Sequence, residues 1–323
     1  TVQMSGASIV NQLIFVYNLT IFGGVSGAGI FTAQFYGYGD QEGVRSTFRF
    51  KLWLVILLTA GAILIFWNAG PTLIRFYLRG DGNAGDAEAI LNYGLQYLRI
   101  MLLGLPAFML SQTYSSTLRE CGMTLLPMKA GLASVLVNLV FNYLLIYGKF
   151  GFPELGVRGA AIATVLSRYV ELAIIVTVSH RNAPADDFTR GLFRTLKVPA
   201  SLCGSIIRKG SPLLVNEALW AAGMAMLTQC YSVRGLDVVA ALNISSTIGN
   251  LFNIVFIALG DSVAIVVGQL LGAGEMEAAR DTDNKLIAFS VFCCTVVASV
   301  MFIAAPLFPR LYHTSEEIRL LAA

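Results

Sequence analysis

Six stretches of this chain contain no charged side chain and are long enough to cross a lipid bilayer as helices. They are residues 1–39, 52–74, 100–118, 130–148, 238–260 and 286–309. A transmembrane helix needs about 20 mostly apolar residues, whereas the strands of a membrane barrel alternate polar and apolar residues. Hydrophobic residues make up 56% of the chain and charged residues 13%, which is too apolar for a soluble protein of this length. The sequence therefore predicts an all-α integral membrane protein.

Two further apolar segments, 157–179 and 211–233, carry charges and bring the expected number of helices to eight. The expected helices are 7–36, 52–77, 88–118, 124–148, 157–179, 211–233, 237–271 and 286–311. Thirteen Lys and Arg residues lie at one set of helix ends, in 37–51, 119–130, 180–209 and 272–285, and seven lie at the opposite ends. Because Lys and Arg are enriched in cytoplasmic loops, the first set is expected in the cytoplasm. We expect a multi-pass protein of the cell membrane, specifically the bacterial inner membrane.

Part of the sequence occurs twice. "TAQFYGYGDQEGVRSTFR" at 32–49 aligns with "VGQLLGAGEMEAARDTDN" at 267–284 under a constant shift of 235 residues. The shift pairs Gln34 with Gln269, Gly37 with Gly272, Gly39 with Gly274, Glu42 with Glu277, Arg45 with Arg280 and Thr47 with Thr282. It also pairs Ile9 with Ile244 and Tyr77 with Tyr312, so the register holds over about 70 residues. This pattern predicts an internal duplication.

A duplicated helical bundle is typical of transporters, in which the substrate site lies between two halves that move against each other. We expect an N-terminal lobe at 1–185, a cytoplasmic linker at 186–208 and a C-terminal lobe at 209–323. Because both copies of the repeat end in a loop expected in the cytoplasm, the lobes are expected to be related by a pseudo-twofold axis along the membrane normal. A complete chain should then hold about twelve helices, with the first helix and the last three helices absent here.

Four segments together resemble the multidrug and toxic compound extrusion (MATE) transporters. They are "GGVSGAGIFTAQFYGYGD", "YLRIMLLGLPAFMLSQTYSSTLRECGMTLLPM", "VNLVFNYLLIYGKFGFPELGVRGAAIATVLSR" and "VAALNISSTIGNLFNIVFIALGDSVAIVVGQLLGAGE". The resemblance covers nearly the whole chain and implies two six-helix lobes that export organic cations against inward H+ or Na+. Some prokaryotic members carry Asn and Asp one turn apart on the fifth helix. This chain has Asn138 and Asn142 instead, which puts a first-lobe cation site built on that Asp in doubt.

Polar side chains follow one face of the expected helix 237–271. They are Asn243, Ser246, Asn250, Asn253 and Asp261, and the first copy has Ser8, Asn11, Asn18 and Ser26 at equivalent places. Such a stripe is costly in lipid and is expected either to line a water-filled cavity between the lobes or to form hydrogen bonds between helices of one lobe. We predict cavity lining, with Asn138 and Asn142 also facing substrate.

Glu217 is the main candidate for ion coupling. It follows Asn216 early in the helix 211–233, and Trp220 and Met224 lie one and two turns further along the same face. Burial raises the pKa of a carboxyl group, so Glu217 could exchange a proton for a cation, or could bind Na+ together with the carbonyl oxygen of Asn216. The structural alternative is a carboxylate that reaches the cytoplasmic surface near Lys209. Asp261 is a second candidate, either for coupling or as a hydrogen-bonded acid.

The other charges suggest structural roles. Arg168 and Glu171 are three residues apart on one helix and are expected to pair, whereas Arg119 and Glu120 are expected to be solvated. No spacing of His or Cys indicates a metal site, so we expect no metal and no cofactor beyond the H+ or Na+ that drives transport.

Three functions agree with these observations. Export of cationic, amphipathic small molecules by H+ or Na+ antiport is preferred, and a lipid-linked saccharide flippase of the same superfamily is the closest alternative. A channel or an intramembrane enzyme is the alternative from a different class, but paired acids and HExxH motifs are absent from the expected helices. We expect membrane lipid and small-molecule substrates as partners, no nucleic acid, and a monomer.

Overall fold

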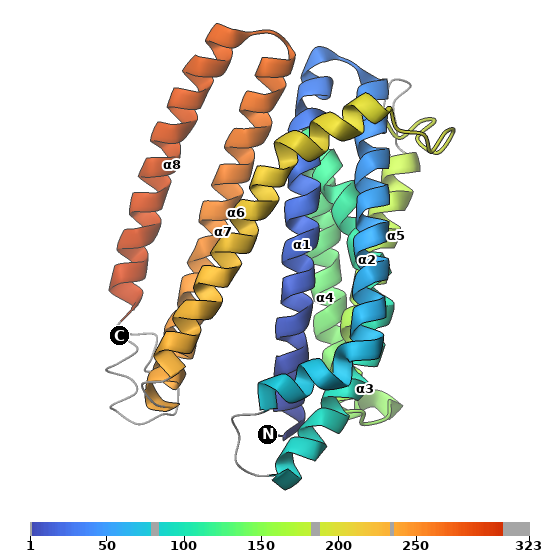
Figure 1. The fold of residues 1–323 in the computed structure, drawn as a ribbon, viewed down its shortest axis with the longest axis vertical. Helices are drawn as coiled ribbons and strands as arrows, with labels where there is room; N and C mark the ends of the chain where they lie inside the picture. The colour runs from blue at the N-terminus through green and yellow to red at the C-terminus, as the bar shows by residue number, and fades with distance from the viewer. Residues whose placement is uncertain (1, 79–83, 182–187, 233–235, 306–323) are drawn as a thin grey trace. The chain divides into compact units, whose positions relative to one another are not determined.

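The computed structural model describes residues 2–78, 84–181, 188–232 and 236–305, and these form eight α-helices and no strand (Figure 1). The helices are α1 (Val2–Tyr38), α2 (Gln41–Leu78), α3 (Ala84–Glu120), α4 (Leu125–Tyr147), α5 (Val157–Arg181), α6 (Ala200–Ser232), α7 (Leu236–Gly272) and α8 (Met276–Ala304), with a short 3-10 helix η1 (Lys149–Gly151). Seven of them, all except α6, are long and apolar enough to cross a membrane. The predicted all-α membrane fold is confirmed.

The described helices fall into two compact units. Unit 1 holds α1 to α5 and the first part of α6, up to Leu214. Unit 2 holds the rest of α6 together with α7 and α8. The lobe boundaries at 185 and 209 stay a prediction, because a single continuous helix carries the chain from one unit to the next.

Three helices begin earlier than predicted. α2 starts at Gln41 instead of 52, α6 at Ala200 instead of 211, and α8 at Met276 instead of 286. The prediction treated the charged residues beside each apolar run as helix ends. A helix can instead continue beyond the hydrocarbon into the interfacial region, where its charged side chains reach water. The predicted linker is correspondingly shorter, since residues 200–208 are helical.

The repeated sequence encodes the same turn in both units. Gly39 and Gly274, which are 235 residues apart, have φ angles of 83° and 79°. After each glycine a backbone N–H closes the turn, from Asp40 to the carbonyl oxygen of Phe35 at 2.9 Å and from Glu275 to that of Leu270 at 3.1 Å. These pairs are again 235 residues apart, and α2 and α8 begin at equivalent positions, Gln41 and Met276. The repeat is therefore a helix, a left-handed glycine and a second helix.

Both turn glycines are predicted to resist substitution to a similar degree. Gly39→Ala and Gly274→Ala should each lower the free energy of unfolding by about 1 kcal/mol, because a Cβ is unfavourable at positive φ. Thermal unfolding of the full-length protein in detergent measures the effect. Gly61→Ala is the control, because Gly61 lies inside α2 with open space at its Cβ position. If the turn variants unfold no earlier than the control, the turn does not depend on glycine.

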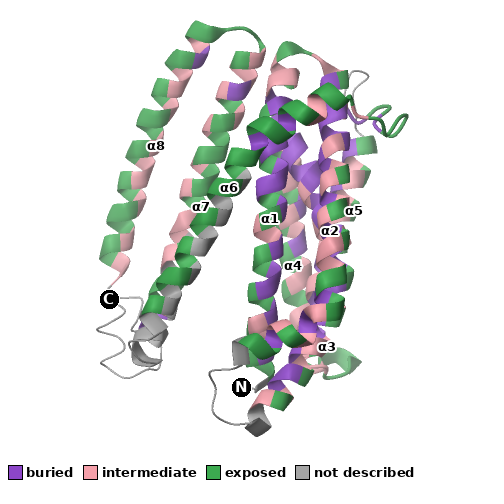
Figure 2. Ribbon diagram, viewed as in Figure 1, coloured by how far each residue is buried: buried purple, intermediate pink, exposed green. Residues whose placement is uncertain are grey.

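The core of unit 1 lies among α1, α2 and α3. Ile21 and Val25 on α1, Val55 on α2, and Leu98 and Leu105 on α3 are buried in one cluster, and Figure 2 shows buried residues along these helices. The hydroxyl groups of Tyr17 and Thr59 lie 2.8 Å apart within this cluster. α3 therefore covers one face of the α1–α2 pair.

The first part of α6 packs on α1 within unit 1. A Cβ atom built on Gly27 would lie 3.1 Å from the Cα atom of Gly210, so the two backbones cross closely. The Lys209 ammonium lies 5.7 Å from the centre of the Phe31 ring, and Ile206 is buried against α1. These contacts attach the start of α6 to unit 1.

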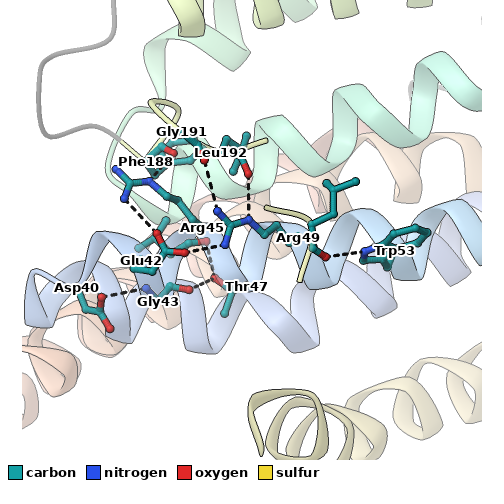
Figure 3. Close-up of polar contacts among 12 residues, drawn as sticks. Asp40, Glu42, Gly43, Arg45, Thr47, Arg49, Trp53, Phe188, Gly191 and Leu192 are labelled. Atoms are coloured by element: carbon teal, nitrogen blue, oxygen red, sulfur yellow. Dashed lines mark hydrogen bonds and ion pairs between the residues drawn. The ribbon is translucent and has the colours of Figure 1, made fainter. Parts of the chain in front are cut away.

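The connection between α5 and α6 is fastened along one side of α2 (Figure 3). Three α2 side chains at four-residue intervals each donate a hydrogen bond to a backbone carbonyl that lies 143 residues later in the chain. The bonds run from Arg45 Nε to Phe188 at 3.2 Å, from Arg49 Nε to Leu192 at 2.9 Å, and from Trp53 Nε1 to Leu196 at 3.1 Å. Residues 188–196 therefore follow α2 in the same direction and are held by its side chains.

Candidate functional site

Two of the predicted cavity residues form an amide chain between α4 and α5. Asn142 Nδ2 donates to Asn138 Oδ1 at 2.9 Å, and Asn138 Nδ2 donates to Thr164 Oγ1 at 3.3 Å. The Thr164 hydroxyl donates in turn to the carbonyl oxygen of Ala160 at 2.9 Å. Asn142 Oδ1 is buried and accepts no hydrogen bond from the described residues. Amide oxygens suit a hard cation or a substrate N–H, although this chain of contacts contains no carboxylate.

The polar residues of α1 lie toward the side that unit 1 leaves uncovered. Asn11 is exposed and accepts a hydrogen bond from the Tyr97 hydroxyl at 3.2 Å. Ser26 is also exposed, and Asn18 is half-buried. Phe15 and Phe22 are exposed as well, so the uncovered side combines amide, hydroxyl and aromatic groups. This mixture suits an amphipathic ligand.

The candidate coupling residues lie on helical segments of unit 2. Asn216, Trp220 and Met224 follow one another at four-residue intervals on α6, and all three are exposed. Glu217 lies on the same helix, three residues before Trp220, and its side chain is outside the described residues, as is that of Asn243. The roles of Glu217, Asn216 and these neighbours stay predictions.

The α7 stripe keeps its helical register in the structure. Asn250 and Asp261 are exposed, and Asn253 is half-buried, as is its repeat equivalent Asn18. Both members of this equivalent pair therefore have the same degree of exposure. Cavity lining by the stripe stays a prediction, since it concerns the space between the two units.

A groove of about 1080 Å³ lies between α7 and α8. Most of its lining is apolar and includes Phe256, Gly260, Val263, Val291 and Phe302, whereas Asn250, Asn253 and Asp261 are not part of it. A shift of 235 maps two of its lining positions, 256 and 260, onto Ile21 and Val25, which are core residues beside α3 in unit 1. The groove therefore has the character of a helix-packing surface and differs from the predicted polar cavity.

A buried ion pair was not predicted from the sequence. Lys51 on α2 is fully buried and bonds to Ser116 Oγ at 3.0 Å, to Thr117 Oγ1 at 3.3 Å and to the Glu120 carboxylate, all on α3. The expectation that Glu120 is solvated is wrong, because its side chain is 7% exposed. Lys51 was counted as a loop charge, since the expected helix began only at 52. The expected pairing of Arg168 with Glu171 is confirmed, at 3.1 Å.

The ion pair depends on a glycine and belongs to one copy of the repeat only. A Cβ atom on Gly29 would collide with the Glu120 carboxylate, so α1 provides the space for this side chain. A shift of 235 puts Ala264 in place of Gly29 and Leu286 in place of Lys51. The second copy thus has neither the cation nor the space. Unit 1 has a polar centre at this level that the duplication does not reproduce.

Comparisons with known proteins connect these features to a family. The family model described as MatE matches residues 1–144 and 212–323. The chain is 26% identical over 319 residues to the probable multidrug resistance protein NorM of Thermotoga maritima, covering 98% of this chain and 66% of that protein. It is 25% identical over 296 residues to the probable multidrug resistance protein YoeA of Bacillus subtilis, covering 90% of this chain and 62% of that protein. The chain thus spans slightly less than two thirds of the length of these relatives.

A solved structure has the same fold. The crystal structure of MATE in the bent conformation superposes with a TM-score of 0.81 at 19% identity, over 100% of this chain and 70% of that chain. At this level of identity the likeness concerns the fold. The helices of this chain are therefore arranged as in a multi-pass membrane transporter.

Proposed function

The chain belongs to the MatE family of transporters, and we propose on that premise that the complete protein is a secondary active exporter of organic cations. The observation that supports this proposal most is the family match on both sides of the α5–α6 connection, over the two copies of the repeat. The duplicated helix–glycine–helix unit is the kind of internal symmetry on which alternating access is built. The protein is a multi-pass membrane protein, and its bacterial relatives place it in the cell membrane.

The proposed substrate is small, cationic and amphipathic. The proposed cavity lining is Asn11, Asn18, Asn138, Asn142, Trp220, Met224, Asn243, Asn250 and Asn253. These amides and the Trp220 ring would hold an aromatic cation through hydrogen bonds and cation–π contact. The names of the two curated relatives, both multidrug resistance proteins, support a drug-like substrate. A flippase for a lipid-linked pyrophosphate would instead require cationic residues in the lining, and this set contains none.

The proposed driving force is the inward movement of H+ or Na+ at Glu217, assisted by Asn216, with Asp261 as a second acid. An ion can drive transport only if its affinity differs between the outward-facing and inward-facing states. A carboxylate provides such a difference when one state pairs it with the cationic substrate and the other leaves it to H+ or Na+.

Ethidium efflux from cells expressing the full-length protein tests this proposal. We expect faster efflux than in cells with an empty vector. Efflux is also expected to slow with a protonophore if H+ is the coupling ion, or in sodium-free buffer if Na+ is the coupling ion. Efflux equal to the empty-vector rate at confirmed expression would contradict drug export.

A further inference from the structure

A small basic pocket lies where the α5–α6 connection meets α2, within unit 1. Its volume is about 370 Å³, and its lining contains four arginines and one carboxylate. The lining residues are Glu42, Arg45 and Arg49 of α2 and Arg190, Gly191, Arg194 and Thr195 of the connection. Figure 3 shows Glu42, Arg45 and Arg49 side by side next to Gly191. Four guanidinium groups and one carboxylate leave an excess of three positive charges.

The two α2 arginines hold the connection in place. Arg49 is 3% exposed, and it bonds to the carbonyl oxygens of Leu192 and Gly191 and to Glu42 Oε1 at 2.7 Å. Arg45 bonds to the carbonyl oxygen of Phe188 and to Glu42 Oε2 at 3.2 Å. The single carboxylate of the pocket is therefore shared between these two arginines. Both also have a structural role.

The two arginines of the connection have no such role among the described residues. Arg190 and Arg194 are exposed, and neither forms an ion pair or a side-chain hydrogen bond with a described residue. They are four residues apart on a connection that α2 holds in a fixed path. Their guanidinium groups therefore add two positive charges to a preformed pocket. Arginine binds phosphate oxygens through paired N–H groups, so the pocket is suited to a phosphate.

Exposed apolar side chains beside the pocket indicate where that phosphate would come from. Phe193 and Leu196 of the connection and Trp53 of α2 are 54%, 48% and 46% exposed, and Trp53 donates to the carbonyl oxygen of Leu196. Tryptophan next to basic residues is typical of the membrane–water interface. The distribution of Lys and Arg assigns this end of the helices to the cytoplasm, where the leaflet carries anionic lipid. A free anion in solution would gain nothing from the apolar neighbours.

We propose that the pocket formed by Arg45, Arg49, Arg190 and Arg194 binds the phosphate of an anionic phospholipid headgroup, with the acyl chains against the exposed apolar side chains beside it. Arg190 and Arg194 bind the phosphate directly. Arg45 and Arg49 set the position of the connection and contribute positive charge. The bound lipid would link α2 to the α5–α6 connection at the membrane surface. This proposal does not depend on the transported substrate.

Lipid titration of the purified full-length protein tests the proposal. Native mass spectrometry measures binding of phosphatidylglycerol, phosphatidylcholine and inorganic phosphate to the wild type and to the double variant Arg190→Gln/Arg194→Gln. The wild type should bind one phosphatidylglycerol saturably and in preference to phosphatidylcholine. The double variant should bind it roughly thirtyfold more weakly, since each basic residue contributes to attraction of anionic lipid. Both positions are exposed, so the variant should fold, which its thermal unfolding temperature checks.

The control is Lys129→Gln/Arg208→Gln. It removes the same charge from exposed residues that are expected on the same membrane side but lie outside the pocket. Its affinity for phosphatidylglycerol should equal that of the wild type. Equal loss in both double variants would show a diffuse charge effect and overturn the site. Saturation by inorganic phosphate without preference for phosphatidylglycerol would overturn the lipid assignment.

Discussion

Replacing Lys51 by methionine is expected to lower the free energy of unfolding by about 3–5 kcal/mol, which would be the largest loss of stability from one substitution in unit 1. The Lys51 ammonium has three N–H groups, and Ser116, Thr117 and Glu120 provide an acceptor for each of them. The methionine variant would leave the Glu120 carboxylate buried without its cation, and an unpaired buried charge is far less stable than a paired one.

A double-variant comparison separates the charge effect from simple loss of packing. Lys51→Met/Glu120→Met removes both charges, so it should recover most of the stability that Lys51→Met loses. Lys285→Met breaks the exposed Lys285–Asp281 pair on α8 and should change stability little. Denaturant unfolding of the full-length protein in micelles provides the comparison. If Lys51→Met is as stable as the wild type, Lys51 does not stabilise the α2–α3 contact.

Replacing Glu217 by glutamine is expected to reduce ion-driven ethidium efflux to the background rate while leaving expression and folding unchanged. Glutamine keeps the size and most of the hydrogen-bonding capacity of glutamate but does not titrate. If the exchange of H+ or Na+ for substrate occurs at this carboxylate, its loss removes the coupling step, which is worth far more than one hydrogen bond.

Rates at matched expression decide the role of Glu217. Glu277→Gln is the control, because it removes an exposed carboxylate from the first turn of α8, outside the proposed site. It should transport at the wild-type rate. Wild-type efflux from the Glu217→Gln variant would assign Glu217 a structural role and make Asp261 the next candidate for coupling.

Features that depend on neighbouring residues along the chain could be predicted from the sequence. The apolar runs indicated the helices, and the constant shift of 235 indicated a turn that the structure forms twice, at Gly39 and Gly274. The pairing of Arg168 with Glu171 depends only on a three-residue helical spacing, and it was also predicted correctly. Helix ends were less predictable, since charged residues next to an apolar run do not end a helix.

Contacts between residues distant in the sequence could not be predicted in this way. Lys51 and Glu120 are 69 residues apart, and no local pattern distinguishes this buried pair from the solvated charges around it. Thr164 was likewise not predicted as the partner of Asn138, because the pairing of α4 with α5 sets that contact. The arginines of α2 looked like ordinary cytoplasmic charges until the structure showed the connection that they hold.

Transport by the purified full-length protein in liposomes tests the proposed exporter most directly. Vesicles loaded with ethidium would be diluted into buffer with a higher H+ or Na+ concentration outside than inside, and the rate of ethidium release would be compared with that at equal ion concentrations. The account predicts that one of the two inward gradients accelerates release and that Glu217→Gln abolishes the acceleration. Release at the same rate with and without either gradient would contradict secondary active export.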